Sequence, residues 1–173
     1  MTLTGIKRGR PRWVIVAVGR TDFKGGIMIQ TILVAIDGSA HSKRALEFAC
    51  DMAAKFDASL HLIHVAEQPM TDHVLSLGAA SVMASGTRAD LTRAGRKVIE
   101  AATDVANRKG CKTISSEVTS GDATRAIVDS AKEIEAGMIV MGTRGLGSLS
   151  GMLLGSVSHK VLHLAPCTCV TVT

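Results

Sequence analysis

The chain has 173 residues, of which 46% are hydrophobic and only 2% aromatic. This length fits one α/β domain with an aliphatic core. No apolar stretch approaches the roughly 18 residues needed to cross a bilayer, so we expect no membrane partner. The four cysteines include no Cys-x-x-Cys pair, which favours reduced thiols and a cytoplasmic protein.

The net charge of +5 is concentrated at the N-terminus. Residues 1–27 hold six of the 20 Lys and Arg and one of the 15 Asp and Glu, so the rest of the chain carries 14 of each. A nucleic-acid-binding domain would carry a basic patch on its folded body. The balanced body therefore argues against a nucleic-acid partner.

The first 27 residues also differ in composition, because they hold the single tryptophan, Trp13, and an isolated apolar run over 13–18. That run is short for a signal-peptide core, and no small-x-small cleavage site follows it. The codons for residues 24–28, Lys-Gly-Gly-Ile-Met, are compatible with a purine-rich ribosome-binding site followed by a start codon at Met28. We interpret 1–27 as an extension, disordered or an artefact of start-site assignment, and 28–173 as the domain. A genuine extra strand or basic arm is the alternative.

From Met28 onward, apolar runs alternate with helical patterns. Segment 31–36 is a continuous apolar run, typical of a strand buried on both faces. Ser39 is a good N-cap for the helix that follows. The apolar positions of that helix share one face: Ala45, Leu46, Ala49, Met52, Ala53 and Phe56.

The remaining elements repeat this alternation. Strands are expected at 59–65, 112–118, 138–141 and 167–172. Helices are expected over about 88–109, ending at Gly110, from Gly121-Asp122 with Ala126, Ile127, Ser130, Ala131 and Ile134 facing inward, and over 156–164. The stretch 66–87 is too long for an ordinary βα loop.

Alternating strands and helices predict an α/β fold with parallel pairing and right-handed crossovers. Five strands favour a doubly wound, flavodoxin-like sheet with the strand order 3-2-1-4-5. Ligands of such sheets bind beyond the strand C-termini, where the strand order reverses. That crevice lies between the strands that end at Asp37 and Gly142.

A glycine-rich segment follows the strand at 138–141. Gly142-Thr-Arg-Gly145 is followed, nine residues later, by Gly155-Ser156, which opens the last helix. Glycines let the backbone approach an anion, and N–H groups at a helix start point at it. We predict a phosphate site here, with the hydroxyls of Ser156 and Ser158 as added donors. The alternative is a flexible loop with a helix cap at Ser156.

Several better-known site patterns are absent from the chain. No Gly-Lys-Ser/Thr completes a Walker A loop, and Ser150 stands where a Rossmann fingerprint needs its third glycine. There is no Gly-x-Ser-x-Gly elbow of an α/β-hydrolase. Haloacid-dehalogenase-like phosphatases need a second Asp where Ser39 stands, and PP-loop pyrophosphatases need a Ser-Gly-Gly-x-Asp-Ser run.

Two charged residues at the crevice have a functional and a structural interpretation. Asp37 either holds Mg²⁺ or bonds a nucleoside, or it forms the Asp-Gly-Ser turn. Arg144 either pairs with phosphate or is a solvated loop charge.

The histidines and cysteines give weaker signals. His61 and His64 face opposite sides of one strand and cannot chelate one ion, so we expect no metal spacing among the histidines. His159 either approaches a phosphate or lies on the surface. Cys167 and Cys169 share one strand face, where core packing is expected.

Together these motifs resemble the universal stress protein family, in its ATP-binding branch. The similarity runs over 28–173 and is carried by Ile32-Leu-Val-Ala-Ile-Asp-Gly-Ser39, Leu62-Ile-His-Val65, Ile139-Val-Met-Gly-Thr-Arg-Gly145, Gly155-Ser-Val-Ser158 and Ala165-Pro-Cys167. It implies the fold called adenine nucleotide α-hydrolase-like and a homodimer formed through the last strand, about 168–172. The resemblance also implies that adenine is flanked by Ala35, Ile36, Asp37 and Val65. It implies that the ribose and phosphates are lined by Met141, Gly142, Arg144 and Gly145. It implies that the phosphates are cradled by Gly155, Ser156, Val157 and Ser158.

The resemblance implies an ATP-binding stress-response protein. It would act as a binding or signalling module with at most slow ATP hydrolysis, because nothing beyond Asp37 resembles a positioned general base. The alternative is an enzyme, a nucleotide-dependent hydrolase or transferase that uses Asp37 and Mg²⁺.

Overall fold

The computed structural model describes residues 29–66, 88–147 and 154–173. The expected extension at 1–27 and nearly all of the stretch 66–87 lie outside these ranges. The described strands form one parallel sheet in the order β3-β2-β1-β4-β5, which confirms the predicted flavodoxin-like topology. The strands are β1 (Thr31–Ala35), β2 (Ser59–Ala66), β3 (Ile114–Ser120), β4 (Met138–Gly142) and β5 (Thr168–Val172).

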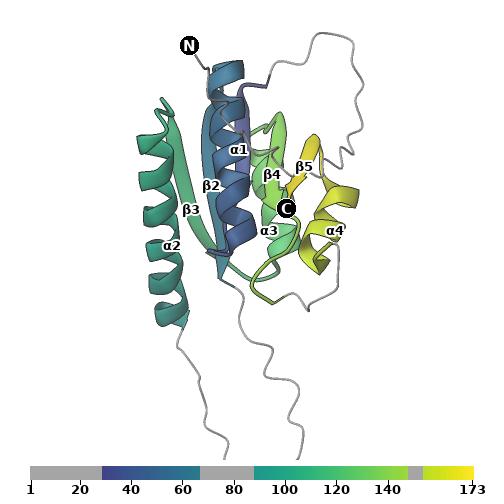
Figure 1. Ribbon diagram of the computed structural model, residues 1–173. Helices are drawn as coiled ribbons and strands as arrows, with labels where there is room; N and C mark the ends of the chain where they lie inside the picture. The colour runs from purple at the N-terminus through teal and green to yellow at the C-terminus, as the bar shows by residue number, and fades with distance from the viewer. Residues whose placement is uncertain (1–28, 67–87, 148–153) are drawn as a thin grey trace, which may run out of the picture.

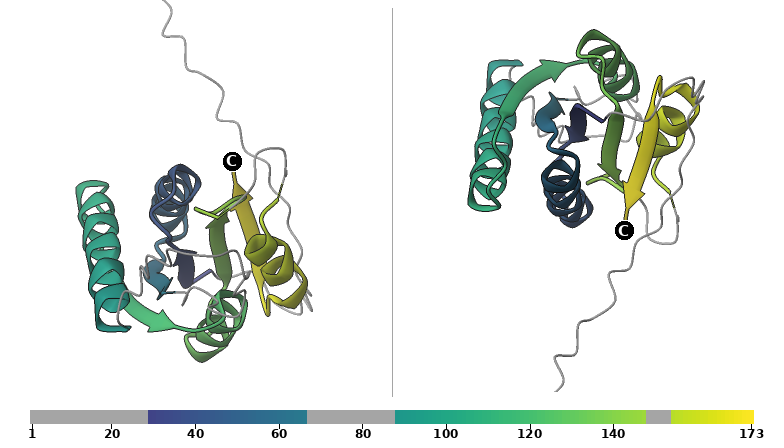
Figure 2. Two further views of the ribbon diagram at one scale, coloured as in Figure 1. Left: turned by 90° about the horizontal axis from the view of Figure 1, so that it is seen from below. Right: turned by 90° about the horizontal axis from the view of Figure 1, so that it is seen from above.

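Within the described ranges, four helices connect the strands and cover both faces of the sheet (Figure 1). They are α1 (Ala40–Phe56), α2 (Arg88–Arg108), α3 (Ala123–Glu133) and α4 (Ser156–Leu164). Helices α1 and α2 lie on one face, and α3 and α4 lie on the other, as Figure 2 shows along the sheet. The molecule therefore has three layers, with the sheet in the middle.

Two hydrophobic cores follow from this layering. Ile32 and Val34 of β1 point into the core under α1 and α2, and Leu33 between them points into the core under α3 and α4. All three side chains are fully buried. This is why β1 reads as a continuous apolar run rather than an alternating one.

Local capping fixes where the helices start. Helix α1 has the predicted N-cap Ser39, whose Oγ accepts a hydrogen bond from the Ser42 amide at 3.1 Å. Helix α3 begins the same way, because Asp122 Oδ1 accepts from the Arg125 amide at 2.7 Å. Such caps satisfy amides that the first helical turn leaves without a partner.

The structure corrects three expectations. Strand β3 spans Ile114–Ser120 rather than 112–118, because its pairing with β2 begins with the hydrogen bond from the Leu60 amide to the Thr113 carbonyl. Phe56 is 47% exposed at the end of α1, although its position fits the apolar face. On α3, Val128 is buried whereas two residues expected to face inward, Ala126 and Ile134, are only half-buried.

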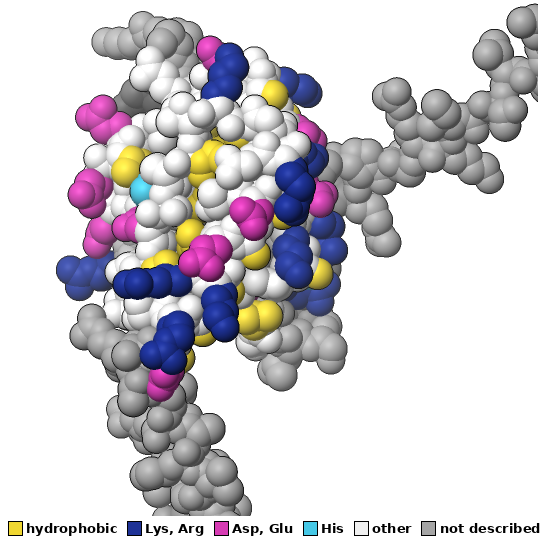
Figure 3. Space-filling view, turned by 90° about the vertical axis from the view of Figure 1, so that its left-hand side faces the viewer, with side chains coloured by type: hydrophobic (Ala, Val, Ile, Leu, Met, Phe, Trp, Pro, Cys, Tyr) yellow, Lys and Arg dark blue, Asp and Glu magenta, His cyan; other side chains and the backbone are white. Residues whose placement is uncertain are grey.

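The face that carries α2 mixes basic and acidic side chains, with apolar patches between them (Figure 3). Such interspersed charge is ordinary for a solvated helix face. None of the helices in the described ranges is long and apolar enough to cross a membrane.

Candidate functional site

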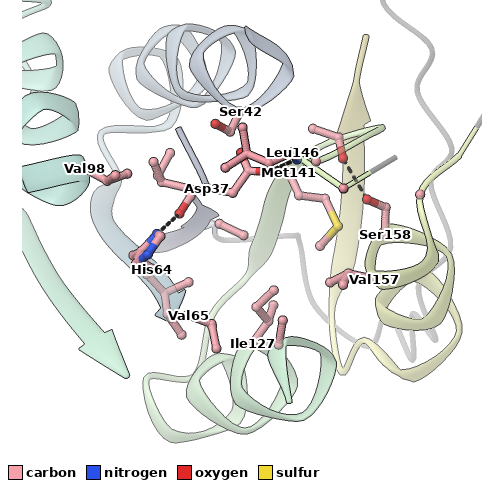
Figure 4. Close-up of a pocket in the computed structure, with 18 of the residues that line it drawn as sticks. Asp37, Ser42, His64, Val65, Val98, Ile127, Met141, Leu146, Val157 and Ser158 are labelled. Atoms are coloured by element: carbon pink, nitrogen blue, oxygen red, sulfur yellow. Dashed lines mark hydrogen bonds between the residues drawn. The ribbon is translucent and has the colours of Figure 1, made fainter. Parts of the chain in front are cut away.

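A cavity of about 770 Å³ lies beyond the C-terminal ends of β1 and β4, where the strand order reverses. This is the position that the fold rule predicts for a ligand. Close-up views show side chains from both halves of the sheet meeting there (Figure 4). All twelve residues that the sequence analysis assigned to a nucleotide site line this cavity: Ala35, Ile36, Asp37, Val65, Met141, Gly142, Arg144, Gly145, Gly155, Ser156, Val157 and Ser158.

Asp37 ties two loops of the cavity together. Its Oδ1 accepts a hydrogen bond from the Ser39 amide at 2.9 Å, which is the turn expected for Asp-Gly-Ser. Its Oδ2 accepts from the Leu146 amide at 3.0 Å, so the carboxylate also holds the glycine loop (Figure 4). Both carboxylate oxygens thus have backbone partners, and each retains further lone pairs.

The glycines after β4 are needed for close packing. A Cβ at Gly145 would lie 2.6 Å from Asp37 Oδ2 and would disturb the bond just described. A Cβ at Gly142 would lie 2.7 Å from the Cβ of His41. The loop therefore approaches the β1–α1 connection more closely than any residue with a side chain allows.

Helix α4 begins at the floor of the cavity. Its N-cap is Gly155 rather than Ser156, and the cap makes no side-chain hydrogen bond. The first helical bond runs from the His159 amide to the Gly155 carbonyl at 2.9 Å. Amides ahead of that bond, in the first turn, point out of the helix end and are suited to an anion.

The hydroxyl of Ser158, which was predicted to be a donor to phosphate, has a partner within the fold. This buried hydroxyl donates to the Gly142 carbonyl at 2.8 Å, which fastens α4 to the end of β4 (Figure 4). A hydrogen bond from the Gly155 amide to the Thr143 carbonyl at 2.7 Å adds to this attachment. The hydroxyl donor left for a ligand is that of Ser156, which is exposed.

Arg144 brings an unsatisfied positive group to the cavity. Its Nε is buried and has no hydrogen-bond partner within the described part of the chain. Nearby, burial and then the charges of Arg44 and Arg144 lower the pKa of His41. His41 is therefore neutral at neutral pH, and its Nδ1 lies 3.1 Å from the Thr143 hydroxyl.

The sequence analysis missed the wall formed by α2. Leu91, Ala94 and Val98 from its first half line the cavity. Helix α2 approaches the sheet closely at Gly95, where a Cβ would lie 2.5 Å from Cδ2 of His64. The helical pattern predicted which face of α2 is apolar. It did not indicate that this face borders the cavity. The other residues of the lining that were not predicted are Ser42, Ile63, His64, Ala66, Ala123, Ile127, Leu146 and Gly147.

The histidines of β2 lie on opposite faces, as expected. His64 Nδ1 lies 2.7 Å from the Ile36 carbonyl and caps the end of β1. His61 is away from the cavity, where its ring nitrogens lie 2.8 Å from Ser115 Oγ and 3.3 Å from Glu117 Oε1. His159 is exposed and outside the cavity lining.

Cys169 of β5 belongs to the core under α3 and α4, and Cys167, which directly precedes the strand, packs against this core; core packing was expected for both, and both thiols are free. Burial raises the pKa of Cys167 to about 11 and that of Cys169 to about 12, so both are protonated thiols at neutral pH. Among the described residues, no group of three His, Cys, Asp or Glu side chains is placed to hold a metal ion.

The fold and the cavity define the structural class of this protein. It is a doubly wound α/β protein with a glycine-lined crevice at the switch point of its sheet. The model of the universal stress protein family matches residues 28–173, and the chain belongs to this family.

Relatives and solved structures agree with this assignment. The chain is 34% identical to universal stress protein YxiE of Bacillus subtilis over 143 residues, which cover 81% of this chain and 96% of that protein. A Thermus aquaticus universal stress protein is 35% identical over 140 residues, covering 81% and 96% of the two chains. A crystal structure of a universal stress protein in complex with cAMP superposes with a TM-score of 0.63 at 28% identity, covering 84% and 98%. An Archaeoglobus fulgidus family member in complex with dAMP shares the fold, with a TM-score of 0.61 at 20% identity over 84% and 99%.

Proposed function

We propose that this protein binds ATP in the crevice between β1 and β4 and acts as a cytoplasmic stress-response binding or signalling module. The observation that carries the proposal is the buried Nε of Arg144, which lacks a partner in the described chain and lies in a lining that also contains the start of α4. A guanidinium and a helix N-terminus are both complementary to phosphate.

The two ends of the cavity differ in chemistry, as a nucleotide requires. Ala35, Val65, Leu91 and Val98 give one part of the lining an apolar character suited to a base. Gly142, Gly145 and the first turn of α4 supply backbone to the other part. The family member solved with cAMP supports an adenine nucleotide as the ligand.

We propose Mg²⁺ as a companion of the phosphates. Mg²⁺ prefers one or two carboxylates together with phosphate oxygens and water. Among the described residues of the lining, Asp37 is the single carboxylate, so it fits an ion held mainly by the nucleotide. Asp37 would then have two roles, since it already accepts two backbone hydrogen bonds.

A binding role is favoured over turnover by the groups available. Within the described lining, the ionisable side chains are Asp37, His64 and Arg144. Asp37 and His64 are both engaged with backbone groups, and the guanidinium of Arg144 offers donors but no acceptor for a proton. The rival proposal, a hydrolase or transferase that uses Asp37 and Mg²⁺, predicts multiple turnovers of ATP by nucleotide-free protein, whereas the binding role predicts at most slow hydrolysis.

We propose that the protein forms a homodimer through the outer edge of β5. The Val172 carbonyl accepts from the Thr143 amide, so Val172 turns its backbone toward β4 and Thr171 turns its backbone toward the other edge. By the same alternation Cys169 turns its backbone away from β4, so Cys169→Pro removes an outward N–H, and Cys169→Ala is the matched control. Sedimentation velocity should show dimers that only the proline variant disrupts, and a monomeric wild type at high concentration contradicts the proposal.

The nucleotide proposal is tested by calorimetric titration of nucleotide-free protein with ATP and adenosine. Removal of a charged hydrogen-bond partner costs about 1.5–3 kcal/mol, or roughly tenfold or more in affinity. Arg144→Ala should impose this loss on ATP while adenosine binds as before. Equal losses for both ligands would show that Arg144 supports the cavity rather than the phosphates. Mass spectrometry of the nucleotide released from purified protein identifies the natural ligand.

A further inference from the structure

Two exposed histidines lie one helical turn apart on α4. His159 and His163 are four residues apart, and their rings contact edge to face with centroids 4.7 Å apart and planes at 70°. The expectation of no metal spacing rested on His61 and His64, which face opposite sides of a strand. On a helix, positions i and i+4 share one face, and two histidines so placed are a known arrangement for one metal ion.

The ring separation fits a shared metal. Imidazole nitrogens bind Zn²⁺ at about 2.0–2.1 Å, which puts each ring centroid about 3.2 Å from the ion. For ligand angles between octahedral and tetrahedral, the two centroids would then lie about 4.5–5.2 Å apart. The observed 4.7 Å falls within this range, so the positions of the two rings are compatible with two imidazole nitrogens on one ion.

We propose that His159 and His163 form a two-histidine site for a divalent transition-metal ion, with water in the remaining positions. Imidazole selects Zn²⁺, Ni²⁺ and Cu²⁺ over Mg²⁺ and Ca²⁺, and Cu²⁺ binds most tightly of these. Since the described residues offer no group of three ligands, the site is open and its metal exchangeable. This site is separate from the Mg²⁺ proposed for the crevice.

A metal ion bound to both histidines would stabilise the helical conformation of α4. The helix has nine residues and a glycine N-cap that makes no side-chain hydrogen bond, so it has few local interactions of its own. Helices of this length are marginal without tertiary support. An ion that bridges two successive turns favours the helical state, because the unfolded chain does not hold both rings together. The first turn of the same helix lines the crevice.

The test is a calorimetric titration of tag-free protein with NiCl₂. The wild type should bind one Ni²⁺ per chain on the order of 10- to 100-fold more tightly than His163→Ala, which retains a single ring. The matched control is the double variant His163→Ala, Leu164→His, which keeps the number of histidines but changes the spacing to five. Leu164 is 59% exposed, so the fold has room for this exchange. Equal affinity of the control and the wild type overturns the proposal, as does binding only at millimolar Ni²⁺.

Hydrogen exchange gives a second readout, which tests whether the bound ion stabilises α4. Ni²⁺ should slow exchange of amides at the end of α4, such as the Ala165 amide that donates to the Val161 carbonyl, in the wild type alone. Should the variants fail to fold, NMR of the wild type decides. The ring signals of His159 and His163 should broaden together at the lowest Ni²⁺ concentration, and broadening of other histidines first contradicts the site.

Discussion

The carboxylate of Asp37 accepts a hydrogen bond from the backbone amide of Leu146 at 3.0 Å, across 109 residues of sequence. The end of β1 thereby holds the loop that follows β4. A residue that the sequence offers as a metal or nucleoside ligand is thus also the anchor of the glycine loop. Its substitution should change the shape of the crevice as well as its charge.

Asp37→Asn is expected to lower both stability and nucleotide affinity. The amide replaces one acceptor by a donor, so one of the two backbone N–H groups loses its partner, at a cost of about 1–3 kcal/mol in the free energy of unfolding. Because Asp37 is proposed both to hold the loop and to bind Mg²⁺, the affinity for ATP should fall in EDTA and fall further in Mg²⁺, measured by calorimetry. The same loss in both conditions would contradict the metal role of Asp37, and a loss confined to Mg²⁺ would contradict its role in the loop.

Gly142→Ala should destabilise the fold. The new methyl would lie 2.7 Å from the Cβ of His41 and 2.9 Å from its backbone, which cannot move freely at the start of α1. Overpacking of this kind costs about 1–3 kcal/mol. Gly147→Ala is the control, because no atom lies within 4 Å of its added Cβ. Urea denaturation should separate the two variants, and equal midpoints would show that the contact relaxes at no cost.

Gly95→Ala should also destabilise the protein, although a change from glycine to alanine within a helix usually stabilises it. Alanine in a helix interior is ordinarily favoured over glycine by about 1 kcal/mol. Here the methyl would lie 2.5 Å from His64 Cδ2 and 2.9 Å from Val118 Cγ1. In a His64→Ala background the penalty should shrink, and a double-mutant cycle measures that coupling. Stabilisation in the wild-type background would mean that α2 shifts outward freely.

Alkaline pH should destabilise the protein through Cys169. Burial raises the pKa of this thiol from 9.0 to about 12, so the folded state keeps its proton above pH 9 while the unfolded chain loses it. Stability is therefore unaffected below pH 9 and falls above it, by about 1.4 kcal/mol at pH 10. Denaturant titrations at pH 7 and pH 10 should show this extra loss in the wild type relative to Cys169→Ala. Parallel losses would place the thiol in contact with water.

The sheet order and the crevice were predictable because β1 and β4 are unbroken apolar runs followed by turn and glycine signals. Such a run predicts a strand that is buried on both faces. The rule for doubly wound sheets then places a ligand beyond the end of that strand. The role of Leu91 and Val98 was not predictable, since periodicity gives the apolar face of α2 but not its neighbour across the crevice. The role of Ser158 depends on one hydrogen bond to Gly142 that only the fold brings together.

The central claim, that phosphate lies at the start of α4, is tested most directly by Gly155→Val. Gly155 has a φ of −73°, and an added Cβ would meet its nearest neighbours at 3.4–3.8 Å, so the variant is expected to fold. Gly147→Val is the control, because it changes another glycine of the lining where the added Cβ has open space. Calorimetry with ATP should show a loss of roughly tenfold or more for Gly155→Val and little change for the control. A folded Gly155→Val protein that binds ATP as tightly as the wild type would contradict the phosphate site and the function proposed from it.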